Sequence, residues 1–167
     1  MPVLAATAKP LPSFSRLAWL MGLYAENYQR MARLFDLPAM AKGVYLSTCP
    51  NGLELVVEVL EVHAYTIELC ISYRMSDPVT GRPDPSAYVR IYRDARQAEV
   101  THCYIGRQWQ DVLGLHPEPK VMFGHRLRMN SFLNKWLEYL IGQGHGPHTL
   151  GPMPLDQPSD EAALAIA

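Results

Sequence analysis

The sequence predicts an α+β fold in which an antiparallel sheet packs against one helix near each end of the domain. Three observations lead to this prediction. Apolar residues recur at helical spacing near both ends of residues 13–143, they alternate with polar residues in between, and no helical segment separates the expected strands. Strands that follow one another in this way pair as an antiparallel meander. We therefore expect a single domain with a four- or five-stranded sheet.

The composition is that of one globular domain. Of the 167 residues, 49% are hydrophobic and 19% are charged, and a chain of this length can bury a self-sufficient core. The formal net charge of −1 implies no general attraction to nucleic acid or to an acidic membrane. The longest apolar run, residues 17–25, is too short to span a bilayer. The three cysteines include no CxxC pair. We expect a soluble, cytoplasmic protein without a membrane partner.

Both ends of the chain are expected to be flexible. Residues 1–12 and 144–167 are rich in proline and small residues. Such segments do not bury enough apolar surface to offset the entropy cost of ordering them. The domain is therefore expected over residues 13–143.

The first helix is expected over residues 14–36. Ser13 or Ser15 can cap its start, apolar residues follow at helical spacing, and Pro38 ends it. Gly22 lies in its middle and indicates either a close packing contact or a break.

The second helix is expected over residues 127–142. An apolar stripe of helical period runs through this segment and ends at Gly142 and Gly144. Residues 106–125, which contain Pro117 and Pro119, are expected to be irregular.

Between the helices the apolar period changes from 3.6 to two, which predicts strands. Asn51-Gly52 is a strong hairpin signal, and the proline-rich residues 76–86 form a loop. The expected strands are 44–46, 53–62, 65–73, 87–92 and 98–104.

No known catalytic or cofactor-binding motif is present. The sequence has no phosphate-binding glycine loop and no GxSxG elbow, so we expect no cofactor and lean against an enzyme. The six histidines show no HxH or HExxH spacing, and we predict no metal site. They are His63, His102, His116, His125, His145 and His148.

The strongest candidate site is the polar and aromatic cluster of the last predicted hairpin. Strand alternation places Tyr88, Arg90 and Tyr92 on one face, and Glu99 of the next strand can face Arg90 or Tyr92. One interpretation is a cross-strand ion pair that helps set the register. The other is a surface for an anionic or planar ligand, because Arg pairs with phosphate or carboxylate and Tyr stacks. The predicted ligand-binding residues are Arg90, Tyr92, Asp94, Glu99, Asn27 and Tyr28.

Residues 82–135 hold nine basic and five acidic residues. The basic residues could form the solvated face of a neutral protein, or they could contact an acidic partner or RNA with aromatic residues stacking beside them. The candidates are Arg107, Lys120, Arg126 and Arg128, with Trp109 and Phe123.

Four motifs together resemble the YqiB-like family of small cytoplasmic bacterial proteins, a domain of unknown function. The resemblance covers about residues 20–144. The motifs are Tyr24-x-x-Asn27-Tyr28, Tyr65-Thr66, Val89-Arg90-Ile91-Tyr92-x-Asp94-Ala95-x-x-Ala98-Glu99-Val100 and Asn130-x-Phe132-Leu133-x-x-Trp136-Leu137. The resemblance implies the domain limits and the compartment, but no activity and no catalytic residue.

We therefore expect a non-catalytic binding or regulatory module for a small anionic ligand or a protein partner. A small enzyme acting on a phosphorylated or carboxylated metabolite is one alternative, and it requires a pocket with a base or nucleophile of perturbed pKa beside Arg90. An RNA-binding protein is the other alternative. It requires a continuous basic surface with exposed aromatic residues, and the neutral net charge disfavours it.

Overall fold

The structure is a computed structural model that describes residues 15–76, 78–79, 81, 83, 85–104 and 117–154, with residues 103 and 104 described in backbone only. The described part contains two α-helices, a 3₁₀ turn and six strands. In chain order they are α1 (Arg16–Leu34), η1 (Leu37–Ala39), β1 (Gly43–Ser47), β2 (Leu55–Val62), β3 (Thr66–Tyr73), β4 (Ser86–Tyr92), β5 (Gln97–Tyr104), α3 (Pro119–Gln143) and β6 (Leu150–Pro152).

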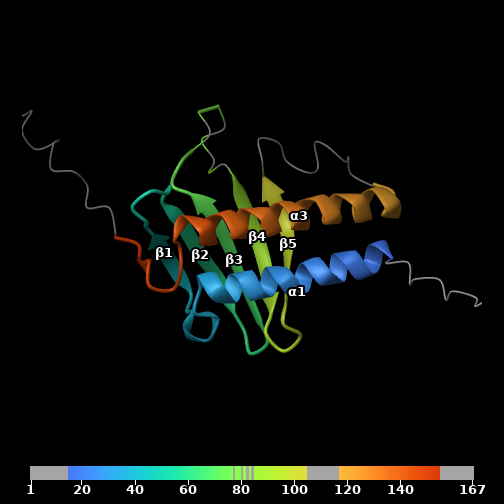
Figure 1. Ribbon diagram of the computed structural model, residues 1–167, viewed down its shortest axis with the longest axis horizontal. Helices are drawn as coiled ribbons and strands as arrows, with labels where there is room; N and C mark the ends of the chain where they lie inside the picture. Colours follow the sequence, from blue (N-terminus) through green and yellow to red (C-terminus); the bar gives the residue numbers. More distant parts are fainter. Residues whose placement is uncertain are drawn as a thin grey trace, which may run out of the picture.

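The strands form one antiparallel sheet in the order β5-β4-β3-β2-β1-β6. Both helices lie side by side across one face of this sheet, with their N-terminal ends extending past β5 (Figure 1). The α+β class, the antiparallel pairing and the two helices are confirmed. The sheet leaves its other face without a helix in the described residues.

The number of strands is a correction. We expected four or five, and the sixth strand, β6, lies in residues 144–167, where the proline content predicts no regular structure. Gly151 pairs with Leu46 of β1, and Pro152 pairs with Tyr45. Proline is compatible with this position because β6 is an edge strand. Residues 1–14 and 155–167 lie outside the described residues.

The start of the second helix is also a correction, because α3 begins at Pro119 and not at residue 127. A proline in the first helical turn removes only an N–H group that has no partner there anyway. The helix ends at Gly144, which adopts the left-handed conformation with φ of 97°.

Local sequence explains the first helix. Ser15 caps α1 by accepting a hydrogen bond from the Ala18 N–H group at 3.1 Å. The helix runs through Gly22 without interruption, and a Cβ atom there would meet nothing within 4 Å. Gly22 therefore marks neither a break nor a close contact. Neither helix has a segment long and apolar enough to cross a membrane, as far as the described residues go.

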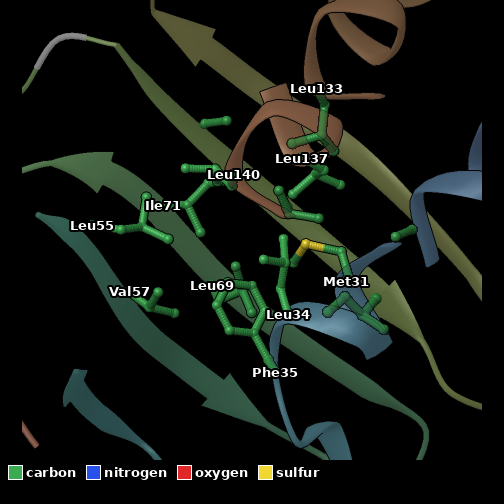
Figure 2. Close-up of a cluster of buried hydrophobic side chains, with 14 of the residues drawn as sticks. Met31, Leu34, Phe35, Leu55, Val57, Leu69, Ile71, Leu133, Leu137 and Leu140 are labelled. Carbon is green, nitrogen blue, oxygen red and sulfur yellow. The ribbon is translucent and has the colours of Figure 1, made fainter. Parts of the chain in front are cut away.

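The core lies between the helices and the sheet, where apolar side chains of both meet (Figure 2). Its largest fully buried side chains include Met31, Leu34, Phe35, Leu55, Val57, Leu69, Ile71, Leu133, Leu137 and Leu140. A second, smaller cluster joins the N-terminal halves of the two helices and consists of Leu20, Leu23, Tyr24 and Leu127, with Phe123 packed against it.

Candidate functional site

The predicted site residues of β4 and β5 lie on the face of the sheet opposite to the helices. Val89 and Ile91 are buried, whereas Arg90 is 42% exposed. Arg90 lies opposite Glu68 of β3 and opposite Glu99 of β5 in the strand register. Its Nε donates to Glu68 Oε1 at 2.8 Å, and its Nη2 lies 2.7 Å from the same oxygen. The ion-pair partner of Arg90 is therefore Glu68.

Glu99 is held by other groups. Its Oε1 accepts a hydrogen bond from the Tyr92 hydroxyl at 2.7 Å, and its Oε2 lies 3.7 Å from Nη1 of Arg126 in α3. Tyr24 of α1 lies beside the same carboxylate: burial raises the pKa of Tyr24, the Arg126 hydrogen bond opposes this shift, and Glu99 adds to it. We call Glu68, Arg90, Tyr92, Glu99 and Arg126 the Arg90 network.

The positive and negative side chains of the Arg90 network pair with one another. The hydrogen bonds that Arg90 donates to Tyr92 and Glu68 raise the pKa of Arg90. Burial and the nearby Glu99 carboxylate raise the pKa of Tyr92. Each guanidinium group thus already faces a carboxylate. An anionic ligand would have to replace Glu68 to gain the paired hydrogen bonds of Arg90.

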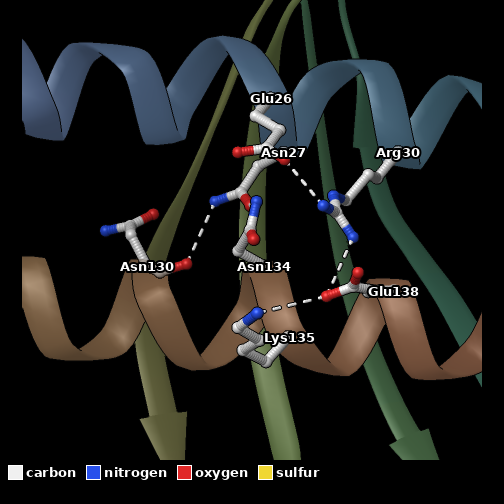
Figure 3. A network of polar contacts seen from close by, with 7 residues as sticks. All are labelled: Glu26, Asn27, Arg30, Asn130, Asn134, Lys135 and Glu138. Atoms are coloured by element: carbon white, nitrogen blue, oxygen red, sulfur yellow. Dashed lines mark hydrogen bonds and ion pairs between the residues drawn. The ribbon is translucent and has the colours of Figure 1, made fainter.

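The other three predicted site residues lie apart from Arg90. Asn27 is fully buried between the helices, where its Nδ2 donates to the Asn130 carbonyl at 3.4 Å (Figure 3). Tyr28 packs against the main core, and Asp94 accepts from the Ala95 N–H group in the β4–β5 turn. The structure therefore groups Arg90, Tyr92 and Glu99, and Tyr24 is the residue of α1 that approaches them.

Asn130 connects the helices to the edge of the sheet. Its Oδ1 accepts from the Val100 N–H group of β5 at 3.0 Å, and its Nδ2 donates to the Arg126 carbonyl at 2.9 Å. Asn134 donates to Asn27 Oδ1 at 3.2 Å. These bonds satisfy buried polar groups, which would otherwise be costly to leave unpaired.

A polar groove of about 240 Å³ lies over the two helices. Arg30 contacts Glu26 at 2.6 Å and Glu138 at 3.5 Å, and Lys135 contacts Glu138 at 3.3 Å (Figure 3). Its volume is below the roughly 300–1,000 Å³ of ordinary ligand pockets. The lining residues are Glu26, Gln29, Arg30, Arg33, Glu138 and Ile141, so acidic and basic groups balance.

Several large apolar side chains are exposed near the N-terminal ends of the helices. Leu17 is 59% exposed and Trp19 is 58% exposed, and Met21 and Val121 are also exposed. We call these four residues the α1 patch.

The basic residues considered for RNA do not share one role. Lys120, Arg126 and Arg128 are all exposed, and Arg126 also contacts Glu99. Phe123 packs against the small helical cluster, so its ring is partly covered. Arg107 and Trp109 lie outside the described residues.

Sequence reasoning missed a second polar cluster, at the end of the sheet where β1 and β6 pair. It joins Ser47 and Cys49 to His145 and Thr149. No spacing signal could find it, because the residues are nearly one hundred positions apart and His145 falls in the predicted flexible segment. Within the described ranges, no three His, Cys, Asp or Glu side chains gather as metal ligands would.

The sequence matches the family described as "Protein of unknown function (DUF1249)" over residues 30–146. The match covers more than half of the chain, so the chain belongs to this family. No curated protein and no solved structure matches the chain.

Proposed function

We propose that this member of a family of unknown function is a non-catalytic binding module whose partner is another protein. The observation that carries the proposal is the exposure of the residues of the α1 patch, above all of the Trp19 side chain, which is 58% exposed.

The composition of α1 explains why this surface is unusual. Residues 17–25 contain no charged residue, and a helix that is apolar on all sides is normally buried. Here only one side packs, through Leu20, Leu23 and Tyr24 against Leu127. Exposed apolar patches of this kind mark interaction sites, and tryptophan and methionine are enriched in protein interfaces.

The surroundings of the α1 patch favour an acidic partner. Among the described residues of these helix segments, Arg16, Lys120 and Arg128 are exposed and outnumber the exposed Glu118. The N-terminal ends of both helices also lie at this end (Figure 1), and helix N-termini carry partial positive charge. We infer a partner segment that combines apolar side chains with aspartate or glutamate.

A small anionic ligand is the second candidate, supported by the partly exposed guanidinium of Arg90 beside Tyr92. Its proposed site consists of Arg90, Tyr92 and Glu99. Asp94, Asn27 and Tyr28, which were also predicted from the sequence, lie apart from these residues. The enzyme and RNA alternatives, the YqiB-like assignment and the cytoplasmic location stay predictions from the sequence.

Photo-crosslinking in cells tests the protein partner. A benzophenone-bearing residue is placed at position 19 and, as the matched control, at position 139, because Tyr139 is also aromatic and 56% exposed but lies elsewhere on α3. We expect a defined protein crosslink from position 19 alone. In the purified complex, Trp19→Ala should weaken binding at least about tenfold, salt should weaken it further, and Tyr139→Ala should leave it unchanged.

Equal crosslinking from both positions, or native affinity after Trp19→Ala, would contradict the proposal.

A thermal-shift screen of nucleotides, sugar phosphates and organic acids tests the second candidate, the small anionic ligand. Stabilisation by such a compound that is lost in Arg90→Lys would favour the small-ligand site, because lysine keeps the charge without the paired geometry.

A further inference from the structure

Cys49 and His145 form a close thiol–imidazole contact. Cys49 lies just after β1, in the turn toward β2, and His145 follows the end of α3. The Cys49 Sγ atom is 3.3 Å from Nε2 of His145, and the other ring nitrogen, Nδ1, is 2.7 Å from the Ser47 hydroxyl. A nucleophile, a base and a group that orients the base are thus in contact, which is the arrangement of activated nucleophiles.

The hydrogen-bond network allows an arrangement of protons in which His145 can act as a base. Thr149 Oγ1 donates to the Gly146 carbonyl at 2.9 Å, which leaves its oxygen free to accept from Ser47. When Ser47 donates to Thr149 across 2.7 Å, its oxygen can accept from the His145 Nδ1–H group. In this tautomer Nε2 presents a lone pair to the Cys49 thiol, and in the other tautomer Nε2–H can donate to the Leu53 carbonyl.

We propose that Cys49 is a nucleophilic thiol that undergoes exchange with small disulfides, with His145 as its general base. The proposal does not depend on the α1 patch, because the two surfaces belong to different parts of the fold. Its test and the crosslinking test can therefore fail separately.

Burial supports the role of His145. The residue is only 5% exposed, and this burial lowers the pKa of its imidazole, with partial opposition from a hydrogen bond to the Leu53 carbonyl. Burial therefore favours the neutral ring, which can accept a proton. Burial also raises the pKa of Tyr73, the β3 residue that faces Cys49. The other titratable groups on adjoining segments are Tyr139, His148 and the Glu54–Arg74 ion pair.

The proposed step is balanced. His145 Nε2 takes the proton of the Cys49 thiol, and the sulfur attacks one sulfur atom of the disulfide R–S–S–R. A new S–S bond to Cys49 forms as the old S–S bond breaks, and the departing thiolate takes the proton from His145 and leaves as R–SH.

Disulfide exchange suits this site better than acyl transfer does. Acyl transfer needs hydrogen-bond donors for a developing oxyanion. The neighbouring N–H groups of Thr48 and Gly52 already donate to the Thr149 and Cys49 carbonyls, both at 3.4 Å. Exchange requires only a reactive and accessible sulfur, and Cys49 is partly exposed.

The unmodified full chain tests the proposal first. The probe is the coloured disulfide 5,5′-dithiobis(2-nitrobenzoate), and the modified cysteine is identified by mass spectrometry after cleavage at glutamate, because Glu54 and Glu68 lie between Cys49 and Cys70. Between pH 8 and pH 6 an ordinary thiol with a pKa of about 8.5 loses roughly two orders of magnitude in rate. We expect Cys49 to lose less than about tenfold, because the neutral base persists to lower pH.

Cys70 is an internal control. It is buried, and burial raises its thiol pKa to about 11, so it should react only after unfolding. If Cys49 follows the pH profile of the same cysteine in the chain unfolded by guanidinium, the proposal is wrong.

Variants then separate the effect of His145 on the reaction rate from general effects of folding. Cys49→Ser should remove the fast reaction, and His145→Gln should slow it at least about tenfold at pH 7. His148→Gln, a matched change at an exposed neighbour, should have no effect. A native rate in a folded His145→Gln chain would overturn the role of His145. If that variant does not fold, Ser47→Ala replaces it, since it keeps the imidazole and removes the hydroxyl that contacts His145 Nδ1. An unchanged rate there has the same consequence.

Discussion

Gly52 shows how one residue controls the packing around Cys49. A Cβ atom at position 52 would lie 2.4 Å from Cys49 Sγ and 3.5 Å from Nε2 of His145. No real Cβ contact is as short as the first distance. The absence of a side chain at position 52 is therefore what allows the thiol and the imidazole to meet.

Gly52→Ala should lower the free energy of unfolding by about 1–3 kcal/mol, the usual cost of overpacking a filled site. Gly22→Ala is the matched control, because a Cβ atom there meets nothing within 4 Å. Replacing a glycine in a helix by alanine should raise stability by about 0.5–1 kcal/mol. Urea unfolding of both variants measures the contrast, and equal effects would contradict this account.

The residues of the Arg90 network could be predicted only in part. Alternation along β4 and a short hairpin to β5 were sufficient to bring Arg90, Tyr92 and Glu99 to one face. The partner Glu68 was not predictable, because β3 and β4 are joined by a long segment whose length does not fix the strand register.

At the scale of elements, the sheet was predictable where the pattern is local. The five strands expected from the period of two are present, with ends that differ by one or two residues. The strand that the sequence did not predict, β6, has three residues and gains its structure only from pairing with β1. The early start of α3 was missed because a proline in a helical first turn has the same local sequence signal as one in a loop.

The pairing of β3 with β4 can be tested by a double-mutant cycle. Arg90→Ala and Glu68→Gln should show a coupling free energy of about 0.2–1 kcal/mol, since the pair is cross-strand and half exposed. The corresponding cycle of Arg90→Ala with Glu99→Gln should give a coupling near zero, because Glu99 is bonded to Tyr92 and Arg126. Urea unfolding provides both values, and a larger coupling to Glu99 would reverse this assignment.

At the scale of the whole molecule, segments distant in sequence complete the fold. The last described residues return to β1, place Thr149 on Ser47, and cover the β1 edge through β6. Such closure depends on tertiary contacts and not on local propensity. This is why neither β6 nor the Cys49–His145 pair could be read from sequence patterns.

Truncation tests the role of this closing segment. A chain that ends at residue 154 should keep the melting temperature of the full chain. A chain that ends at residue 144 should melt at least about 5 °C lower, because it loses β6, His145 and Thr149 and leaves Ser47 without its partners. Equal melting temperatures, measured by circular dichroism, would show that this segment contributes nothing to stability.

The dependence of stability on pH provides a readout of His145 in the whole fold. Its pKa is lowered in the native state, so below about pH 6.5 the unfolded chain binds a proton that the native chain does not yet bind. The unfolded state therefore gains stability as the pH falls, and the free energy of unfolding should decrease by up to about 1.4 kcal/mol per pH unit from this group. Burial and Arg128 also lower the pKa of His125, so the pH dependence of the native chain alone does not isolate the effect of His145.

We expect the free energy of unfolding of His145→Gln, measured in urea, to change less steeply between pH 7.5 and pH 5.5 than that of the native chain. A native slope in His145→Gln would mean that this imidazole titrates alike in both states.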